Sequence, residues 1–257
     1  MTTQAQLGDN TYTLERFPLD QKNRSLQAWD SGDEYLVNYV QEHYPDANSI
    51  LILNDSFGAL ACAFNTLTVY SVNDSYIGHQ ATRYNLQANE LSTDSLTQLD
   101  SLAALPNQVD LVILKVPRNL GYLQHQLAAI SAALPADIDV IAAGKTKDIH
   151  NSTIKAFSQY IGETSTSLAV KKSRLIISKT SGLNKVAPYP VNWPLEGSEF
   201  EIQNHANVFS RDSLDIGARF FFNYLPQTSK ARSIIDLGCG NGVVGLMTLK
   251  RCPKAHV

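Results

Sequence analysis

The sequence contains little cysteine: only three of its 257 residues, Cys62, Cys239 and Cys252. An odd number without metal-ligand spacing argues against a disulfide framework and a cysteine-based metal site, and indicates reduced thiols in a reducing compartment. No apolar run approaches the length of a membrane span. The first twenty residues are polar, without the basic and apolar regions of a signal peptide. We therefore expect a cytoplasmic protein that contacts no membrane and binds no metal.

The sequence also has no excess of basic residues. Lys and Arg number 21 against 24 Asp and Glu, which gives a net charge of −3 and a pI of about 6.1. Because affinity for nucleic acid comes from Lys and Arg placed near phosphates, any such contact must use local patches. The chain is 44% hydrophobic and 18% charged, a balance typical of globular proteins, and its length allows one large domain or two smaller ones.

Short apolar runs alternate with helical patterns as far as residue 178. The expected strands are residues 49–54, 68–72, 109–116 and 137–143. The expected helices are residues 30–44, 57–64, 76–90, 120–134 and 152–161. Repeated strand–helix units predict an open α/β sheet with right-handed crossovers. The basic turn KKS between two apolar runs (165–170 and 174–178) predicts an antiparallel hairpin that closes the sheet.

A change in composition separates this region from the rest of the chain. Residues 181–199 are rich in Gly, Pro, Asn and Ser, which is typical of a linker. The chain then restarts with a strand-like segment (200–210), a helix (212–225) and a strand, glycine loop and helix from Arg232 onward. The expected domains are residues 1–182 and 199–257, joined by a linker at 183–198.

The two regions resemble each other in sequence. If Gly58 is aligned with Gly242, the strands and the helices that follow them also align. Gly238 then corresponds to Asn54, and Gly240 corresponds to Ser56. This pattern predicts a duplicated domain whose first copy has lost most glycines of its loop.

The stretch IIDLGCGNGVVGL, residues 234–246, carries the most specific signal. Gly240, Gly242 and Gly245 fit the fingerprint G-x-G-x-x-G, in which bare backbone and the start of a helix approach a ligand. Asp236 stands immediately before this loop. Its carboxylate would repel a pyrophosphate and attract a cation, which disfavours a nicotinamide oxidoreductase. A glycine-rich turn without a ligand would leave the conformational cost of four glycines unexplained.

The segment DLGCGNG resembles motif I of the class I S-adenosylmethionine-dependent methyltransferases. In that family the acidic residue meets the cationic amino end of the cofactor. The resemblance implies five cofactor contacts: Asp236, Gly238, Gly240, Asn241 and Gly242. It implies four more in the segment before the motif, unless that segment is simply a helix docked on the sheet: Phe209, Ser210, Asp215 and Gly217.

The first region lacks the corresponding catalytic motif. After its strand at 109–116 the chain reads VPRN, where catalytic amino-group methyltransferases have Asn/Asp-Pro-Pro-aromatic. We therefore expect this copy to be catalytically inactive. Asp74, at the end of another strand, is expected to cap a helix rather than hold a cofactor.

Longer segments carry a closer resemblance: TLERFP, SLQAWDSGDEYLV, NDSYIGHQATRYNL and LEGSEFEIQNHANVFSRDSLDIGARFF. With motif I they resemble the ribosomal RNA large subunit methyltransferase G family, whose small-subunit relative, methyltransferase C, has a similar two-domain plan. The resemblance implies an RNA-binding first domain and a catalytic second one. It implies methyl transfer from S-adenosylmethionine to guanine N2 in 23S rRNA, and catalytic residues beyond Val257. We expect the given chain to be inactive alone, and the protein to be a monomer.

Three basic patches are candidate RNA contacts, although each is also compatible with an ordinary solvated turn. Their residues are Lys115, Arg118, Lys145, Lys147, Lys171, Lys172 and Arg174. Those that follow strands would lie at the carboxyl edge of the sheet, where open α/β folds usually bind ligands. Two alternatives stay open: an RNA-binding protein without enzymatic activity, and a methyltransferase that acts on protein glutamine.

Overall fold

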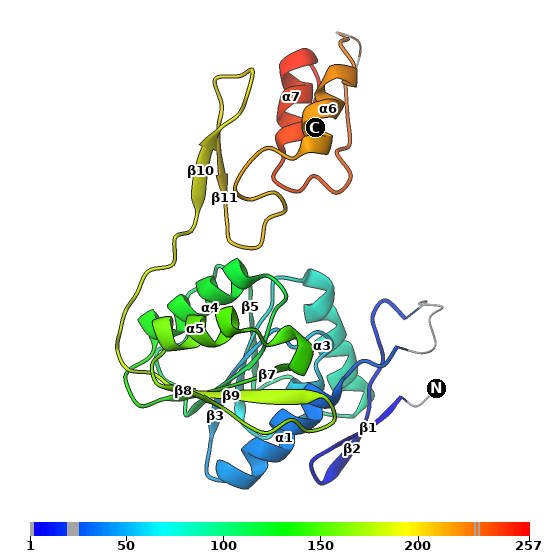
Figure 1. Ribbon diagram of the computed structural model, residues 1–257. Helices are drawn as coiled ribbons and strands as arrows, with labels where there is room; N and C mark the ends of the chain where they lie inside the picture. The colour runs from blue at the N-terminus through cyan, green and yellow to red at the C-terminus, as the bar shows by residue number, and fades with distance from the viewer. Residues whose placement is uncertain (1–2, 20–25, 229, 231) are drawn as a thin grey trace. The chain divides into compact units, whose positions relative to one another are not determined.

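The computed structural model describes residues 3–19, 26–228, 230 and 232–257. The chain divides into two compact units, Met1–Val186 and Ala187–Val257 (Figure 1). They are called here the N-terminal unit and the C-terminal unit, and each is described by itself.

A seven-stranded mixed sheet forms the centre of the N-terminal unit, with strand order β5-β4-β3-β6-β7-β9-β8. The strands are β3 (Ser49–Leu53), β4 (Thr68–Val72), β5 (Leu96–Leu99), β6 (Leu111–Lys115), β7 (Asp139–Lys145), β8 (Thr164–Thr166) and β9 (Ser173–Lys179). The pairings among β3 to β7 are parallel, while β9 pairs antiparallel with both β7 and β8. The expected open α/β sheet with a closing hairpin is thus confirmed.

Helices cover both faces of this sheet (Figure 1). The helices are α1 (Ser31–His43), α2 (Ala59–Ala63), α3 (Tyr76–Ala88), α4 (Leu120–Ala133) and α5 (Asn151–Tyr160), with a 3-10 turn η1 (Thr146–Asp148). On one side α2 contacts both α1 and α3, and on the other α4 packs against α5. Within the ranges that the structure describes, no helix has the length and apolar character needed to cross a membrane.

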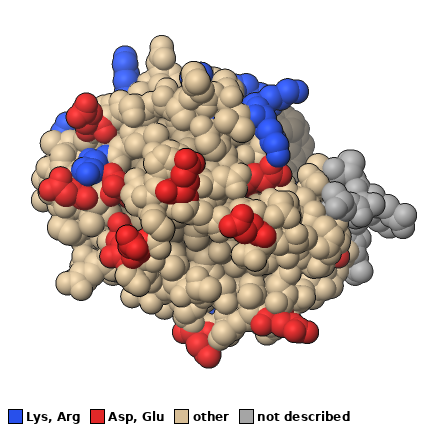
Figure 2. Space-filling model, turned by 90° about the horizontal axis from the view of Figure 1, so that it is seen from below, with Lys and Arg blue, Asp and Glu red and all other residues tan. Residues whose placement is uncertain are grey.

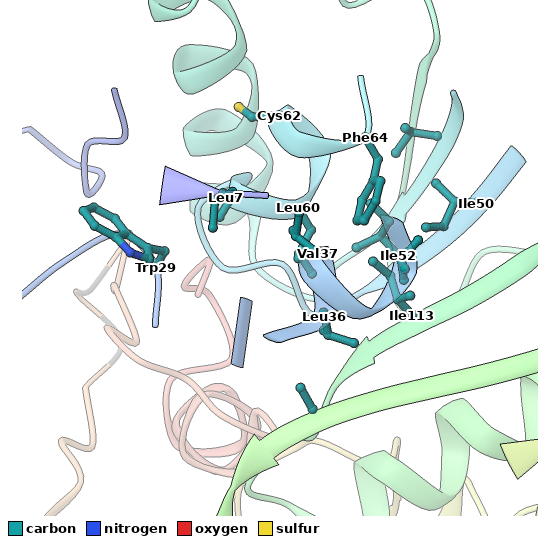
Figure 3. Packing of buried hydrophobic residues seen from close by; sticks show 14 of the residues in the cluster. Leu7, Trp29, Leu36, Val37, Ile50, Ile52, Leu60, Cys62, Phe64 and Ile113 are labelled. Carbon is teal, nitrogen blue, oxygen red and sulfur yellow. The ribbon is translucent and has the colours of Figure 1, made fainter. Parts of the chain in front are cut away.

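The main core lies between the sheet and helices α1 and α2 (Figure 3). Ile50 and Ile52 of β3 and Ile113 of β6 pack there with Leu36 of α1 and Leu60 of α2. Residues 50–53 of β3 are buried without interruption. Such a continuous run is what a central parallel strand needs, because helices cover both of its faces.

Three elements of this unit were not expected from the sequence. The strands β1 (Gln4–Leu7) and β2 (Asn10–Thr13) form a hairpin, and β5 lies at the sheet edge. All three are four residues long and rich in polar residues, so their hydrophobic pattern is weak. The expected cap at Asp74 is wrong by one residue, because the Ser75 hydroxyl caps α3 by accepting the Gly78 N–H.

The C-terminal unit contains a hairpin of β10 (Val191–Pro194) and β11 (Glu201–Asn204), then α6 (Ile216–Phe221), the 3-10 turn η2 (Phe222–Tyr224) and α7 (Val243–Arg251). The linker expected at 183–198 therefore includes a paired strand. The strand expected after Arg232 is reduced to one parallel bridge, between Ser233 and His256. A strand needs neighbours for its backbone groups, and the described residues supply this one pairing.

A buried ion cluster joins α1 to the end of β6. The Lys115 amine lies 2.6 Å from an Asp30 carboxylate oxygen and 2.7 Å from an Asp33 oxygen. Burial raises the pKa of Asp33. Burial by itself lowers the pKa of Lys115, but the two carboxylates outweigh it and raise that pKa. Asp30 and Asp33 also form the capping box of α1, so the lysine holds the start of this helix against the sheet.

We predict that Lys115→Met lowers the free energy of unfolding by about 3 kcal/mol, because it leaves a buried carboxylate without its partner. Urea titration of the chain measures this change. Arg118→Met, three residues further along and exposed, is the control and should change stability by less than about 0.5 kcal/mol. An unchanged unfolding midpoint for Lys115→Met would show that the cluster is not important for stability.

Candidate functional site

The glycine loop of the C-terminal unit has the backbone conformation of a ligand-binding turn. Gly238, Gly240 and Gly242 have φ angles of 76°, 57° and 76°, a left-handed region that side chains with a Cβ rarely adopt. Gly242 is also the N-cap of α7 and has no side chain with which to cap it. Of the first N–H groups of α7, that of Gly245 goes to Asp236 and that of Val243 to the Asn241 side-chain oxygen at 3.5 Å, which leaves that of Val244 without a partner in the described chain. A helix start of this kind attracts anionic or polar ligand atoms.

Asp236 is tied to the helix that follows this loop. Its Oδ2 atom accepts the N–H of Gly245 at 2.9 Å, while its Oδ1 atom has no hydrogen-bond partner among the described residues. A Cβ on Gly245 would lie 3.2 Å from Oδ2, so a glycine here allows the carboxylate to come close to the helix. The site thus combines a fixed carboxylate with an open acceptor atom and a backbone without side chains.

Two other features show that the loop lacks contacts. The Nδ2 atom of Asn241 is buried, yet no group of the described chain accepts its hydrogen bond. Ile235 and Leu237, on either side of Asp236, are 85% and 95% exposed. Apolar side chains of a sheet strand are normally buried, so this segment presents a surface suited to further sheet packing.

Four residues in the segment before the glycine loop were predicted to contact the cofactor. The structure gives two of them a clear structural role. Asp215 caps α6 by accepting the Ala218 N–H at 2.9 Å. A Cβ on Gly217 would lie 2.9 Å from the same carboxylate, so this glycine makes room for the cap. Phe209 is exposed, and the Ser210 hydroxyl donates to the Ser213 carbonyl. A cofactor contact by these four residues stays a prediction.

The N-terminal unit repeats the geometry of this loop at two of the three aligned glycine positions; Ser56, aligned with Gly240, is not in the left-handed region. Gly58, aligned with Gly242, is likewise the N-cap of its helix and has a φ of 86°. Asn54, aligned with Gly238, has a φ of 66° although it is not glycine. Ser49, aligned with Ser233, also begins a parallel pairing with the next segment of its unit.

In the N-terminal unit a side chain of the chain itself occupies the helix start. The buried Asp55 carboxylate accepts the N–H groups of Gly58, Leu60 and Ala61 at 2.9–3.0 Å. The amide of Asn73, at the end of β4, donates to the Asp55 carbonyl. The N–H groups that a ligand would need are thus already used. Asp55 belongs to no motif in the sequence, and its one signal there is its place three residues before a helix-capping glycine.

Burial raises the pKa of Asp55 to about 6, and the charge of Asp33 acts in the same direction. The N–H groups of Ala61 and Gly58 favour the ionised form and limit the rise. The carboxyl therefore keeps its proton in the folded unit at pH values where an exposed aspartate would have lost it.

The end of β6 is also occupied by side chains of the unit itself. Lys115 ends this strand and binds Asp30 and Asp33, with 17% of its side chain exposed. The prediction that Lys115 contacts RNA is corrected here, because its charge is already neutralised inside the unit. Arg118, by contrast, is exposed.

Five of the predicted RNA contacts lie around the junction of β7 and β9. Lys145 pairs with Ser173 in the sheet register, and both the N–H and the hydroxyl of Thr146 donate to the Lys172 carbonyl. Lys145, Lys147 and Lys172 are exposed. Lys171 is also exposed but binds Glu34 of α1 at 2.6 Å. Arg174 is half-buried, and its Nε atom has no partner within the described chain.

Charge is distributed unevenly along the N-terminal unit. Residues 1–139 hold 6 basic and 16 acidic side chains, a net of −10, whereas residues 140–186 hold 8 basic and 2 acidic ones, a net of +6. Seen from below, acidic side chains spread over the face, and Lys and Arg lie towards its upper border (Figure 2). Positive charge is therefore concentrated in the last part of this unit, and polyanions are attracted to it more than to residues 1–139.

Comparison with known proteins identifies both units. The family model described as RLMG N-terminal domain matches residues 2–182, and the model described as methyltransferase small domain matches residues 199–257. The ribosomal RNA large subunit methyltransferase G of Pseudoalteromonas translucida (strain TAC 125) is 72% identical over the whole chain and 68% of its own length. The chain belongs to the ribosomal RNA large subunit methyltransferase G family.

Other members of the methyltransferase G family are less similar in sequence. The protein of Erwinia tasmaniensis is 47% identical and that of Yersinia enterocolitica 45%, each over 99% of this chain. The chain spans 65–68% of the length of these curated relatives.

A solved structure shows the same fold. The 16S rRNA N2 methyltransferase of T. thermophilus, determined with AdoMet and guanosine, superimposes with a TM-score of 0.56 at 17% identity. The match covers 86% of this chain and 56% of that one. It supports a methyltransferase-like fold for the methyltransferase G chain.

We predict that stability depends on pH through Asp55. Its pKa is raised from 3.8 to about 6 by folding, so the folded unit holds a proton that the unfolded chain releases. This contribution is complete below pH ~4 and is lost as the pH rises to ~6, a change of roughly 3 kcal/mol. The difference in unfolding free energy between wild type and Asp55→Asn, measured in urea from pH 4 to pH 7, should fall accordingly.

The exposed Asp94 offers a matched control, because Asp94→Asn removes a carboxylate that is not buried. Its difference from wild type should not follow the same course. A constant difference for Asp55→Asn across this range would contradict the raised pKa.

Proposed function

We propose that this chain is the larger part of an S-adenosylmethionine-dependent methyltransferase that forms N2-methylguanine in 23S rRNA. One observation carries the proposal: the left-handed glycine loop with its anchored Asp236 lies in the unit that the methyltransferase small domain model matches. In this reading the C-terminal unit binds the cofactor and the N-terminal unit binds RNA.

The domain boundaries follow from the same reading. Residues 1–182 form a degenerate methyltransferase-like domain, and residues 199–257 begin the catalytic one. The linker between them is residues 183–198, which include the strand β10. The conformations shared by Gly58 with Gly242 and by Asn54 with Gly238 support a tandem duplication, of which this chain contains the second copy in part.

The residues of the glycine loop fit S-adenosylmethionine. This cofactor supplies a methyl group on a positively charged sulfur, and it carries an ammonium group. Asp236 offers a carboxylate for the cationic end, and the backbone at Gly238, Gly240 and Gly242 allows a close approach. Asn241 contributes a buried amide donor that has no partner in the described chain.

The acceptor explains why RNA must be held firmly. The lone pair of guanine N2 is delocalised into the ring, so the nitrogen is a weak nucleophile. The base must leave its stack and be oriented towards the methyl group, and the N2–C bond forms as the S–C bond breaks and N2 loses a proton. The residues that orient N2 are proposed to lie in the part of the relatives' length that this chain does not span. The chain alone should therefore be inactive.

We predict that Gly240→Val abolishes binding of S-adenosylmethionine in the full-length protein, because a branched Cβ is incompatible with a φ of 57° and fills the approach to the loop. Isothermal calorimetry measures the loss. Gly197→Val is the matched control: Gly197 has a φ of 69° in the same unit but lies outside the loop. Equal binding by both variants would rule out the loop as the cofactor site.

We also predict that Lys145→Glu combined with Lys147→Glu weakens rRNA binding at least tenfold and leaves cofactor affinity unchanged, because the charge reversal acts at phosphate contacts alone. Filter binding of a 23S rRNA transcript over a salt series tests this. Lys155→Glu with Lys185→Glu makes the same charge change at exposed positions elsewhere in the N-terminal unit. If both pairs behave alike, RNA attraction is a property of net charge and not of this surface.

A further inference from the structure

We propose that Thr146 and the turn at Lys171–Lys172 assemble three lysines into one preorganised site for RNA phosphate groups. The site, called here the lysine cluster, consists of Lys145, Lys147 and Lys172. It rests on the proposed function, since RNA is its ligand, and it adds a positioning residue, Thr146, and a reason for the conformation of the turn.

The turn has a conformation that its residues disfavour. Val170 and Ser173 exchange both backbone hydrogen bonds at 2.8 Å, which leaves Lys171 and Lys172 as a two-residue loop. Their φ angles are 47° and 66°. Loops of this type strongly favour Asn-Gly or similar pairs, because in the left-handed region a Cβ comes too close to the following carbonyl oxygen, a cost that Gly avoids and that Asn offsets by local hydrogen bonds. A strained conformation that persists is a reason to look for a function.

Thr146 fixes where Lys172 lies. Its N–H donates to the Lys172 carbonyl at 2.9 Å, and its hydroxyl donates to the same oxygen at 3.0 Å. Thr146 stands between Lys145 and Lys147 in the chain. These two bonds therefore hold the backbone of Lys172 beside the segment that carries the other two lysines, at the carboxyl end of β7.

The two lysines of the turn have different surroundings. The Lys171 amine binds Glu34, which fastens the turn to α1. The amines of Lys172, Lys145 and Lys147 form no hydrogen bond or ion pair with the described residues, and all three side chains are exposed. Asp148 follows Lys147, but no ion pair joins them in the described structure. Three neighbouring cations without carboxylate partners suit a phosphodiester backbone, which presents repeated single negative charges.

The geometry favours phosphate over base recognition. Flexible ammonium groups act as point charges without fixed direction, and contacts of this kind position a nucleic acid without reading its sequence. Substitutions in the lysine cluster should therefore change the affinity for 23S rRNA and the affinity for unrelated RNA by similar factors.

Two substitutions at Lys172 separate the role of the amine from the strain of the turn. Lys172→Gln removes the amine and keeps a side chain in the left-handed region. Lys172→Gly removes the amine and relieves the strain. Each should lower RNA affinity about fivefold near 0.1 M salt and reduce the slope of log K against log salt by about 0.7–0.9. Only Lys172→Gly should also raise the Tm, by about 2–4 °C.

These measurements use filter binding of a 23S rRNA transcript to the chain and thermal unfolding of the same samples. Lys155→Gln, on the exposed side of α5, is the charge-matched control and should leave the salt slope unchanged. Thr146→Val should weaken RNA binding, and Thr146→Ser, which keeps the hydroxyl, should restore it. An altered RNA affinity without a change in the salt slope would mean that these residues act only through folding, and would overturn the proposal.

The outcomes distinguish this proposal from the proposed function. Lys145→Glu with Lys147→Glu could weaken RNA binding while both Lys172 variants bind RNA normally. In that case the N-terminal unit binds RNA, and the proposal that Lys172 belongs to the site is refuted. If none of these variants changes RNA binding, the RNA-binding role of the unit fails with it. If both Lys172 variants bind normally and Lys172→Gly is more stable, the strained turn has no function in RNA binding.

Discussion

The N–H groups at the turn from the first sheet strand into its helix must find partners, and the two units satisfy this constraint in different ways. In the N-terminal unit the Asp55 carboxylate accepts three of them inside the fold. In the C-terminal unit one goes to Asp236 and one to the Asn241 side-chain oxygen, and the glycines of the loop have no side chains with which to cover the helix start. The loop of the N-terminal unit is thus closed by its own buried carboxylate, whereas the loop of the C-terminal unit is exposed and accessible to the proposed cofactor.

Asp55 fills the loop of the N-terminal unit, so no ligand is needed there and the same sheet edge is available for a different contact. Asp55 closes the turn after β3, and the cluster of Lys115 with Asp30 and Asp33 closes the end of β6. Both replace ligand contacts with internal ones and stiffen the edge. The positive charge lies beyond them, where β7 meets β9. An edge closed in this way, with cations at one end, fits the proposed role of this unit in RNA binding.

The sequence predicted those elements whose residues carry a strong local pattern. The apolar run of β3 and the long helix α4 lie within a few residues of their expected positions. The short polar strands β1, β2 and β5 lack such a pattern, although β1 and β2 pair with each other across a short turn; β5 pairs with β4, from which the helix α3 separates it in the chain. The Lys115 cluster was missed for a related reason, because its partners lie more than eighty residues earlier in the chain. The sequence makes Lys145 and Lys172 candidate RNA contacts but does not show that Thr146 joins their segments.

Aligned positions in the two units show what the glycine loop depends on. Leu51 and Leu53 are fully buried in β3, whereas their counterparts Ile235 and Leu237 are 85% and 95% exposed. Burying such a side chain contributes about 2 kcal/mol, so neighbouring strands would add several kcal/mol to this segment. The segment carries Asp236, and its pairing therefore sets how firmly the carboxylate is placed. We therefore expect the proposed cofactor affinity to depend on burial of these two side chains, and the full-length protein is the form in which to measure it.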